Sequence, residues 1–178
     1  KKYIFVSKTA HSRKLMKTID LYNSNVRDLQ EMYPDEEAQS IINILFEEVM
    51  GAGFLHRSNE VPESQQQDIS NAIYRLKKQE PIQYVIGKAH FYGHDFMVSP
   101  DVLIPRRETE DLVHLILNET HNDNAKGLDI GTGSGCIPIT LKLENPTLNV
   151  SALDISADAL KTAETNAKHL GAAVSFFG

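Results

Sequence analysis

Apolar residues in the N-terminal part of the chain recur at the three- and four-residue spacing of a helix. The clearest example covers residues 38–50, and a weaker helical pattern covers residues 15–32. Another helix is predicted after Pro62, with Ser64 as its N-cap. We therefore expect residues 1–81 to form a helical domain.

The pattern changes to strand-like alternation over residues 82–104. Aromatic and β-branched residues alternate there with polar ones, namely Phe91, Phe96, Val98, Val102 and Ile104. A tight turn is predicted at Gly93-His94. We interpret this segment as a β-hairpin that links two domains. The alternative is a β-rich segment that has only a packing role.

From residue 105 onward, helices and strands alternate. A helix begins near Glu108, and further helices are predicted over residues 136–143 and after Ser156, which is a suitable N-cap. Short strands are predicted at 128–130, where we expect burial, at 148–153, and from 174 onward. This order predicts an α/β domain with a parallel sheet of the doubly wound type over residues 105–178.

A glycine-rich loop lies between the first predicted strand and the following helix of this domain. It reads Gly131-Thr132-Gly133-Ser134-Gly135. Glycines allow a sharp bend and let a ligand approach without a Cβ in the way. The helix start offers free N–H groups and a positive dipole end. Asp154 ends the next strand, where a carboxylate can accept hydrogen bonds from ribose hydroxyls.

The spacing of the glycines favours one ligand class over another. Dinucleotide-binding loops follow G-x-G-x-x-G, whereas this loop is G-x-G-x-G with Asp129 two residues ahead. The latter pattern resembles motif I of class I methyltransferases that use S-adenosylmethionine (SAM). A nicotinamide or flavin nucleotide, and a purely structural turn, remain the alternatives.

Composition narrows the function classes. The 178 residues carry a net charge of −6, which argues against a broad phosphate-binding surface. No apolar run is long enough to span a bilayer, and residues 1–10 do not resemble a signal peptide. The single cysteine, Cys136, excludes an internal disulfide. We therefore expect a cytoplasmic protein.

Segments upstream of the loop carry a narrower resemblance. Residues 80–87 (EPIQYVIG), 91–93 (FYG) and 102–110 (VLIPRRETE), together with the glycine loop, resemble the release-factor glutamine methyltransferases, the HemK/PrmC family. The similarity covers roughly residues 65–178, and the first 60 residues match only in helical character. The family usually has proline where this chain has Arg107.

The resemblance implies an N-terminal helical bundle that recognises the substrate, a β-hairpin linker, and the first part of a Rossmann-like, SAM-dependent methyltransferase domain. It implies N5-methylation of the glutamine in the Gly-Gly-Gln motif of translation release factors. Residues 131–135 would hold the methionine part of SAM and Asp154 its ribose, while Arg106 and Thr109 would lie against the cofactor pocket. The partner would be a peptide chain release factor, with nucleic acid involved only indirectly through the ribosome.

The family's Asn-Pro-Pro-Tyr signature does not occur in the 178 residues. We therefore expect residues 105–178 to be the N-terminal part of the domain, and the chain alone to bind SAM weakly without turnover. No catalytic residue is named. The alternatives are a methyltransferase for amino groups of nucleic acids and a non-catalytic interaction module with a degenerate nucleotide fold.

Other candidate sites are weaker. His90 and His94 flank a predicted turn without further clustered ligands, so we predict no metal site. Cys136 falls in the first turn of a predicted helix, where a thiol pKa can fall, but a small packing role is the better interpretation. The acidic residues 35–37 are interpreted as a solvated first helical turn.

Overall fold

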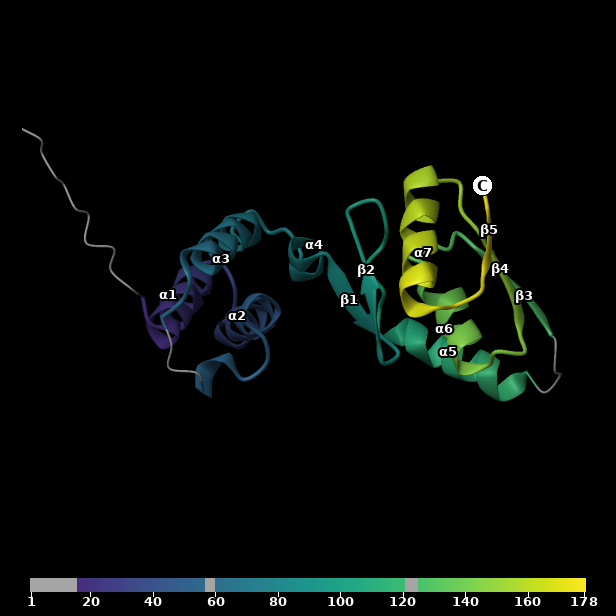
Figure 1. The fold of residues 1–178 in the computed structure, drawn as a ribbon, viewed down its shortest axis with the longest axis horizontal. Coiled ribbons are helices and arrows are strands. Elements are labelled where there is room, and N and C mark those ends of the chain that lie inside the picture. Colours follow the sequence, from purple (N-terminus) through teal and green to yellow (C-terminus); the bar gives the residue numbers. More distant parts are fainter. Residues whose placement is uncertain (1–15, 57–59, 121–124) are drawn as a thin grey trace, which may run out of the picture. The chain divides into compact units, whose positions relative to one another are not determined.

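The computed structural model describes residues 16–56, 60–120 and 125–178 (Figure 1). The chain forms two compact units, Lys1–Gln79 and Glu80–Gly178. The boundary lies within two residues of the predicted end of the helical domain. The hairpin belongs to the second unit.

The first unit is helical, as the spacing of its apolar residues predicted. It contains α1 (Thr18–Gln30), α2 (Asp35–Met50), the 3-10 turn η1 (Phe54–His56) and α3 (Glu63–Leu76). An aromatic cluster lies at its centre, with ring centroids 5.5 Å apart for Tyr22 and Phe46 and 5.4 Å apart for Phe46 and Phe54. The burial of these large side chains supplies much of the driving force for folding this unit.

The predicted N-cap of α3 is wrong. Pro62 occupies the N-cap position with φ −56°, and Glu63 begins the helix without a side-chain cap. Ser64 therefore lies inside the first turn. The fixed φ of proline already directs the chain into the helix, so the serine is not needed at the boundary.

The hairpin is confirmed between β1 (Lys88–Phe91) and β2 (His94–Met97), which pair antiparallel. Its turn is Tyr92-Gly93, one residue earlier than predicted, with φ values of 49° and 80°. Two successive positive φ angles are typical of the tight hairpin turn that matches strand twist. The Tyr92 N–H donates to Glu110 Oε1 at 2.7 Å, which holds a non-glycine residue in this conformation.

The start of the predicted hairpin segment is helical, contrary to the prediction. The residues form α4 (Ile82–Ile86). Pro81 precedes it with φ −56°, and Gly87 ends it in the left-handed conformation with φ 72°. A proline at the start and a glycine at the end frame one short helical turn, which overrides the β propensity of the residues between them.

The second unit contains a parallel sheet in the order β3 (Lys126–Ile130), β4 (Asn149–Leu153), β5 (Ser175–Phe177). The helices are α5 (Glu108–Glu119), α6 (Cys136–Glu144) and α7 (Ala157–Leu170), and Figure 1 shows them on one side of the sheet. The predicted cap of α7 is confirmed, since Ser156 Oγ accepts from the Ala159 N–H at 3.2 Å. The alternation of helices and parallel strands is therefore as predicted.

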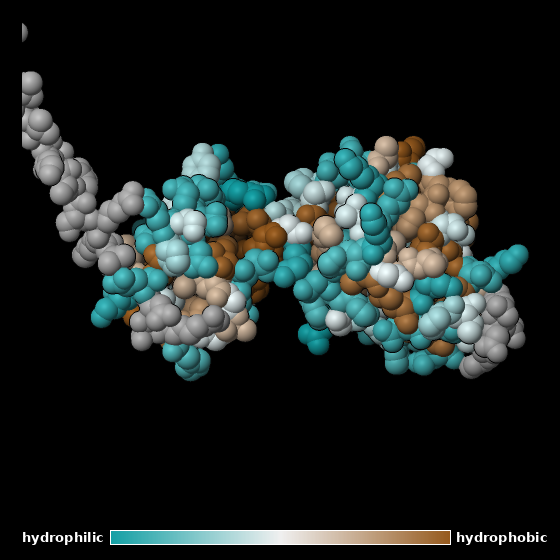
Figure 2. All heavy atoms as spheres, in the orientation of Figure 1, coloured by the Kyte–Doolittle hydropathy of each residue, from teal (hydrophilic) through white to brown (hydrophobic). Residues whose placement is uncertain are grey.

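The expected burial of the first strand is wrong. Leu128 is 57% exposed and Ile130 72% exposed. Strand side chains alternate between faces, and within the described part of the chain the helices cover only the face of Val150 and Ala152. Leu128 lines a hollow of about 610 Å³ together with Leu153 and Phe177. Figure 2 shows apolar residues reaching the surface of both units.

Candidate functional site

The glycine-rich loop follows β3 directly and bends through three left-handed residues. The φ angles are 80° at Gly131, 56° at Gly133 and 78° at Gly135. A Cβ added at Gly131 or Gly133 would meet no atom within 4 Å, so the space beside both residues is open. These two glycines leave a stretch of backbone without side chains that a ligand can approach closely.

Gly135 has a different local role. A Cβ at this position would lie 2.8 Å from Ile139 Cδ1 and 3.0 Å from Ala163 Cβ. The absence of a side chain therefore allows α6 and α7 to approach each other. Of the loop glycines, Gly135 shapes the helix packing beneath the bend, whereas Gly131 and Gly133 face open space.

Backbone hydrogen bonds fix the loop over the end of β4. The N–H groups of Gly131 and Thr132 both donate to the Leu153 carbonyl, at 2.8 and 3.1 Å. The Gly135 N–H donates back to the Thr132 carbonyl at 2.9 Å. The bend is thus held by main-chain hydrogen bonds.

Asp154 follows β4 and its carboxylate is turned toward the loop. Oδ2 accepts from the Gly133 N–H at 2.9 Å, and Oδ1 accepts from the Ser156 N–H at 3.0 Å. These donors, Ser156 first and then Gly133, lower the pKa of Asp154 below its ordinary value. The group is ionised at neutral pH, and each oxygen keeps further acceptor capacity.

The start of α6 provides an electropositive end next to the bend. Gly135 is its N-cap and gives no side-chain cap. The first N–H groups of a helix have no partner within it, and the helix dipole adds a partial positive charge there. Pro138 lies in this first turn, where its missing N–H costs nothing. A carboxylate would be favoured at this place.

Two buried oxygen atoms beside the loop lack partners in the described structure. They are Asp129 Oδ2 and Thr132 Oγ1. Buried polar atoms are nearly always hydrogen-bonded, and an exception at a candidate site points to a ligand or ion that supplies the bond. The carboxylate of Asp129 can accept from an ammonium or amide donor placed near the loop.

Arg106 and Thr109 lie where α5 begins. The Thr109 N–H donates to the Arg106 carbonyl at 3.0 Å, which closes the turn into the helix. Arg106 is exposed and Thr109 is half-buried. Arg107 has φ −60°, an angle that proline also adopts, so the departure from the family pattern leaves this turn intact.

Ile155 is a candidate site residue that the sequence alone did not indicate. It follows Asp154 and its side chain is fully exposed (102%). An exposed apolar side chain next to this carboxylate offers a surface on which a flat, apolar ligand group can pack. The signal in the sequence is an isoleucine directly after the acid at a strand end, where a polar turn residue is more usual.

The two histidines lie beside carboxylates, and the cysteine is buried. His90 Nδ1 lies 3.1 Å from Asp95 Oδ1, and His94 Nε2 lies 3.6 Å from Glu144 Oε1. No cluster of three metal-ligating side chains occurs among the residues that the structure describes. Burial raises the pKa of the Cys136 thiol to about 11.

In residues 16–56, 60–120 and 125–178, no helix is both long and apolar enough to cross a membrane.

Comparison with protein families gives two adjacent matches. Residues 20–87 match the PrmC N-terminal domain, and residues 108–178 match the methyltransferase small domain. Among solved structures, the tRNA (uracil-54, C5)-methyltransferase of Pyrococcus abyssi in complex with S-adenosyl-L-homocysteine is similar at 18% identity. That match has a TM-score of 0.43 and covers 51% of this chain and 22% of that chain.

Curated relatives are more similar. The release factor glutamine methyltransferase of Bacteroides thetaiotaomicron is 42% identical over 154 residues, which is 84% of this chain and 55% of that protein. The protein of the same name from Bacillus subtilis is 46% identical over 117 residues, 59% of this chain and 41% of that protein. The chain thus spans about half the length of these relatives. Over the matched residues, the chain belongs to the release-factor glutamine methyltransferase (HemK/PrmC) family.

Proposed function

We propose that the chain binds SAM on the loop between β3 and α6 and acts in methylating the side-chain amide of a glutamine in translation release factors. The observation that carries this proposal is the open bend at Gly131 and Gly133 with the carboxylate of Asp154 bonded across it. The names of the curated relatives support the reaction and the substrate. The reaction itself is a property of the whole protein.

The residues around the bend fit the chemistry of SAM. Gly131 and Gly133 leave open space beside the backbone, next to the electropositive start of α6, which suits a carboxylate. The unpartnered Asp129 Oδ2 suits an ammonium group. Asp154 suits ribose hydroxyls, and its negative charge disfavours a phosphorylated ribose. Ile155 suits the adenine ring.

Arg106, Thr109, Thr132, Ser134 and Gly135 complete the proposed cofactor site. Thr132 and Ser134 are buried parts of the bend. Gly135 sets the direction of α6. Arg106 and Thr109 form the turn into α5, and we assign them to the wall of the pocket on the basis of the family motif.

The chemistry of the transfer asks little of these residues beyond positioning. Bound SAM would supply an electrophilic methyl group on a sulfonium, and the neutral thioether of S-adenosylhomocysteine would be a good leaving group. The amide nitrogen of glutamine is a weak nucleophile, because its lone pair is delocalised into the carbonyl. The loop and Asp154 hold and orient the methyl donor. The entropy lost when donor and acceptor are aligned is then compensated by the binding free energy of the cofactor. None of the 178 residues is assigned a catalytic role.

We assign substrate recognition to the helical domain, residues 1–81, and a linking role to residues 82–104. The match of residues 20–87 to the PrmC N-terminal domain supports the first assignment. The partner would be a peptide chain release factor in the cytoplasm, with nucleic acid involved only through the ribosome. The net charge of −6 supports a protein over a nucleic-acid substrate.

A chimera tests the reaction. Residues 1–178 replace the matching region of the Bacteroides thetaiotaomicron relative, and labelled SAM is offered with a release factor, DNA or RNA. We expect label on the release factor, at the glutamine of its Gly-Gly-Gln motif by mass spectrometry. Transfer to nucleic acid alone would contradict the proposed substrate. An active chimera whose SAM site is unaffected by Asp154→Ala would contradict the proposed site.

A further inference from the structure

Asn166 lies on α7 and is completely buried, yet its carboxamide makes three hydrogen bonds to main-chain atoms. Oδ1 accepts from the Met97 N–H at 2.7 Å. Nδ2 donates to the Met97 carbonyl at 3.0 Å and to the Ser134 carbonyl at 2.9 Å. One side chain therefore contacts both the last residue of β2 and the glycine-rich loop.

The hairpin register explains why Met97 has both main-chain groups available. The Val98 N–H donates to the Gly87 carbonyl, so this pair is hydrogen-bonded across the hairpin. Pairs alternate along an antiparallel ladder, and the next pair, Lys88 and Met97, is therefore not hydrogen-bonded. The N–H and C=O of Met97 point away from β1. These two groups lie on the outer edge of β2. Asn166 hydrogen-bonds to both of them, as a neighbouring strand would.

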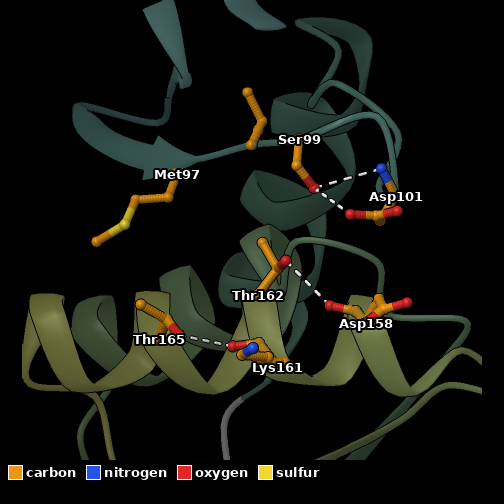
Figure 3. A pocket seen from close by; sticks show the side chains of 8 residues that line it. Met97, Ser99, Asp101, Asp158, Lys161, Thr162 and Thr165 are labelled. Atoms are coloured by element: carbon orange, nitrogen blue, oxygen red, sulfur yellow. Dashed lines mark hydrogen bonds between the residues drawn. The ribbon is translucent and has the colours of Figure 1, made fainter.

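Figure 3 shows this edge close to α7. Met97 and Ser99 lie over the helix, and Thr162 and Thr165 face them from the helix surface. Thr165 is exposed and its hydroxyl donates to the Lys161 carbonyl of its own helix. Thr165, the neighbour of Asn166 in the sequence, thus lines the groove between β2 and α7, and its hydroxyl bonds within its own helix.

In the glycine-rich loop, one peptide group is hydrogen-bonded through both its C=O and its N–H. The Ser134 carbonyl accepts from Asn166, and the N–H of the same peptide, that of Gly135, donates to the Thr132 carbonyl at 2.9 Å. This peptide leads into the N-cap of α6. Its plane sets the direction of the free N–H groups in the first turn of the helix.

We propose that Asn166 is a positioning residue that joins the hairpin to the cofactor loop and holds the Ser134–Gly135 peptide in the orientation that SAM binding needs. The last part rests on the proposed function. Asparagine suits this place because its carboxamide offers two donor hydrogens and an acceptor together. Aspartate lacks the donors. An apolar residue leaves three main-chain groups without this partner, and the Ser134 carbonyl among them lies in a buried contact.

Amide hydrogen exchange in the ligand-free chain, followed by NMR, tests the link. Asn166→Ala is expected to speed exchange about tenfold or more at both Met97 and Gly135. The reference is Val113→Ala, at a fully buried residue of α5 in the apolar core that also includes Ala167 of α7. Thr165→Ala, in the groove, should leave both amides unchanged. An effect at Met97 alone would overturn the link, because Asn166 would then anchor only the hairpin.

The unmodified chain gives a second measurement should Asn166→Ala fail to fold. S-adenosylhomocysteine is expected to shift the side-chain NH₂ signals of Asn166 and the Met97 amide signal along with those of the loop. Loop shifts without a response at Asn166 and Met97 would overturn the proposal.

Affinity tests the positioning role. Asn166→Ala should weaken binding of S-adenosylhomocysteine about tenfold relative to Val113→Ala, which corresponds to losing one well-made buried hydrogen bond. Equal affinities in the two variants would overturn that role. Absence of binding by the unmodified chain, with the exchange pattern as expected, would contradict the proposed function and still support the link between β2 and the loop.

Discussion

The carboxylate of Asp154 accepts a hydrogen bond from the main-chain N–H of Gly133 at 2.9 Å. The bond joins the end of β4 to the loop that follows β3, its neighbour in the parallel sheet. The carboxylate is held on its other oxygen by the Ser156 N–H. Two main-chain donors therefore hold the carboxylate over the bend, and a group that is already held in place has a lower ordering cost on binding.

The lowered pKa of Asp154 predicts a pH dependence of stability. Its folded-state pKa lies below the unfolded value of about 3.9, so its contribution to stability is present above that pH and is lost as pH falls through the folded pKa. Urea unfolding between about pH 7 and pH 3 should show a steeper acid loss for the unmodified chain than for Asp154→Asn. Parallel curves would contradict the assignment.

Gly133→Ala and Gly135→Ala should separate affinity from stability. Both replace a left-handed glycine, at a cost of about 1–2 kcal/mol. Only the alanine at 135 also meets Ile139 and Ala163, so it should lower the free energy of unfolding by about 1–3 kcal/mol more. The alanine at position 133 enters the open bend. Gly133→Ala should therefore weaken S-adenosylhomocysteine binding more than Gly135→Ala does, although it lowers the free energy of unfolding less. Thermal unfolding and ligand titration of the two variants decide this.

Ile155→Ala should weaken ligand binding with little effect on folding. The side chain is fully exposed, so the free energy of unfolding should change by less than about 0.5 kcal/mol. Loss of its contact with adenine should cost about 1 kcal/mol of affinity. Methylthioadenosine, which keeps the adenosine and lacks the amino acid, should be affected as much as S-adenosylhomocysteine. Leu115→Ala, also at an exposed residue, is the control. An affinity that stays constant for both ligands would remove Ile155 from the site.

The raised pKa of Cys136 predicts a thiol that is inert while the protein is folded. Below about 11 the thiol stays protonated, and its side chain is buried. At about pH 8, an aromatic disulfide reagent should react with it only as fast as the chain opens. Denaturant should then release one equivalent of reactive thiol, since the sequence has one cysteine. Rapid reaction in native buffer would show that the first turn of α6 is open.

Much of the site could be predicted from the sequence because its signals are local. The order of strand, glycine loop and helix, the acid after the next strand, and the Ser156 cap all depend on residues close together in the chain. The motif segments upstream indicated the family, which the curated relatives bear out.

Features that depend on long-range packing could not be predicted in this way. The exposure of Leu128 and Ile130 depends on which face of the sheet the helices cover. The role of Asn166 depends on a hairpin 69 residues away in the sequence. On its own, an asparagine in an amphipathic helix reads as a surface residue. The α4 turn was missed because two flanking residues, Pro81 and Gly87, outweigh the β propensity of the five between them.

Titration of the ¹⁵N-labelled chain with S-adenosylhomocysteine, followed by NMR, tests the central claim most directly. We predict saturable shifts at the amides of residues 131–136 and at Asp154 and Ile155. Asp154→Ala should weaken the affinity by about 1.5–3 kcal/mol, and Asp158→Ala, at the start of α7, should leave it unchanged. Saturable shifts that leave residues 131–136, Asp154 and Ile155 unaffected, no saturable shift, or equal affinity after Asp154→Ala would contradict the assignment of the loop as the SAM site.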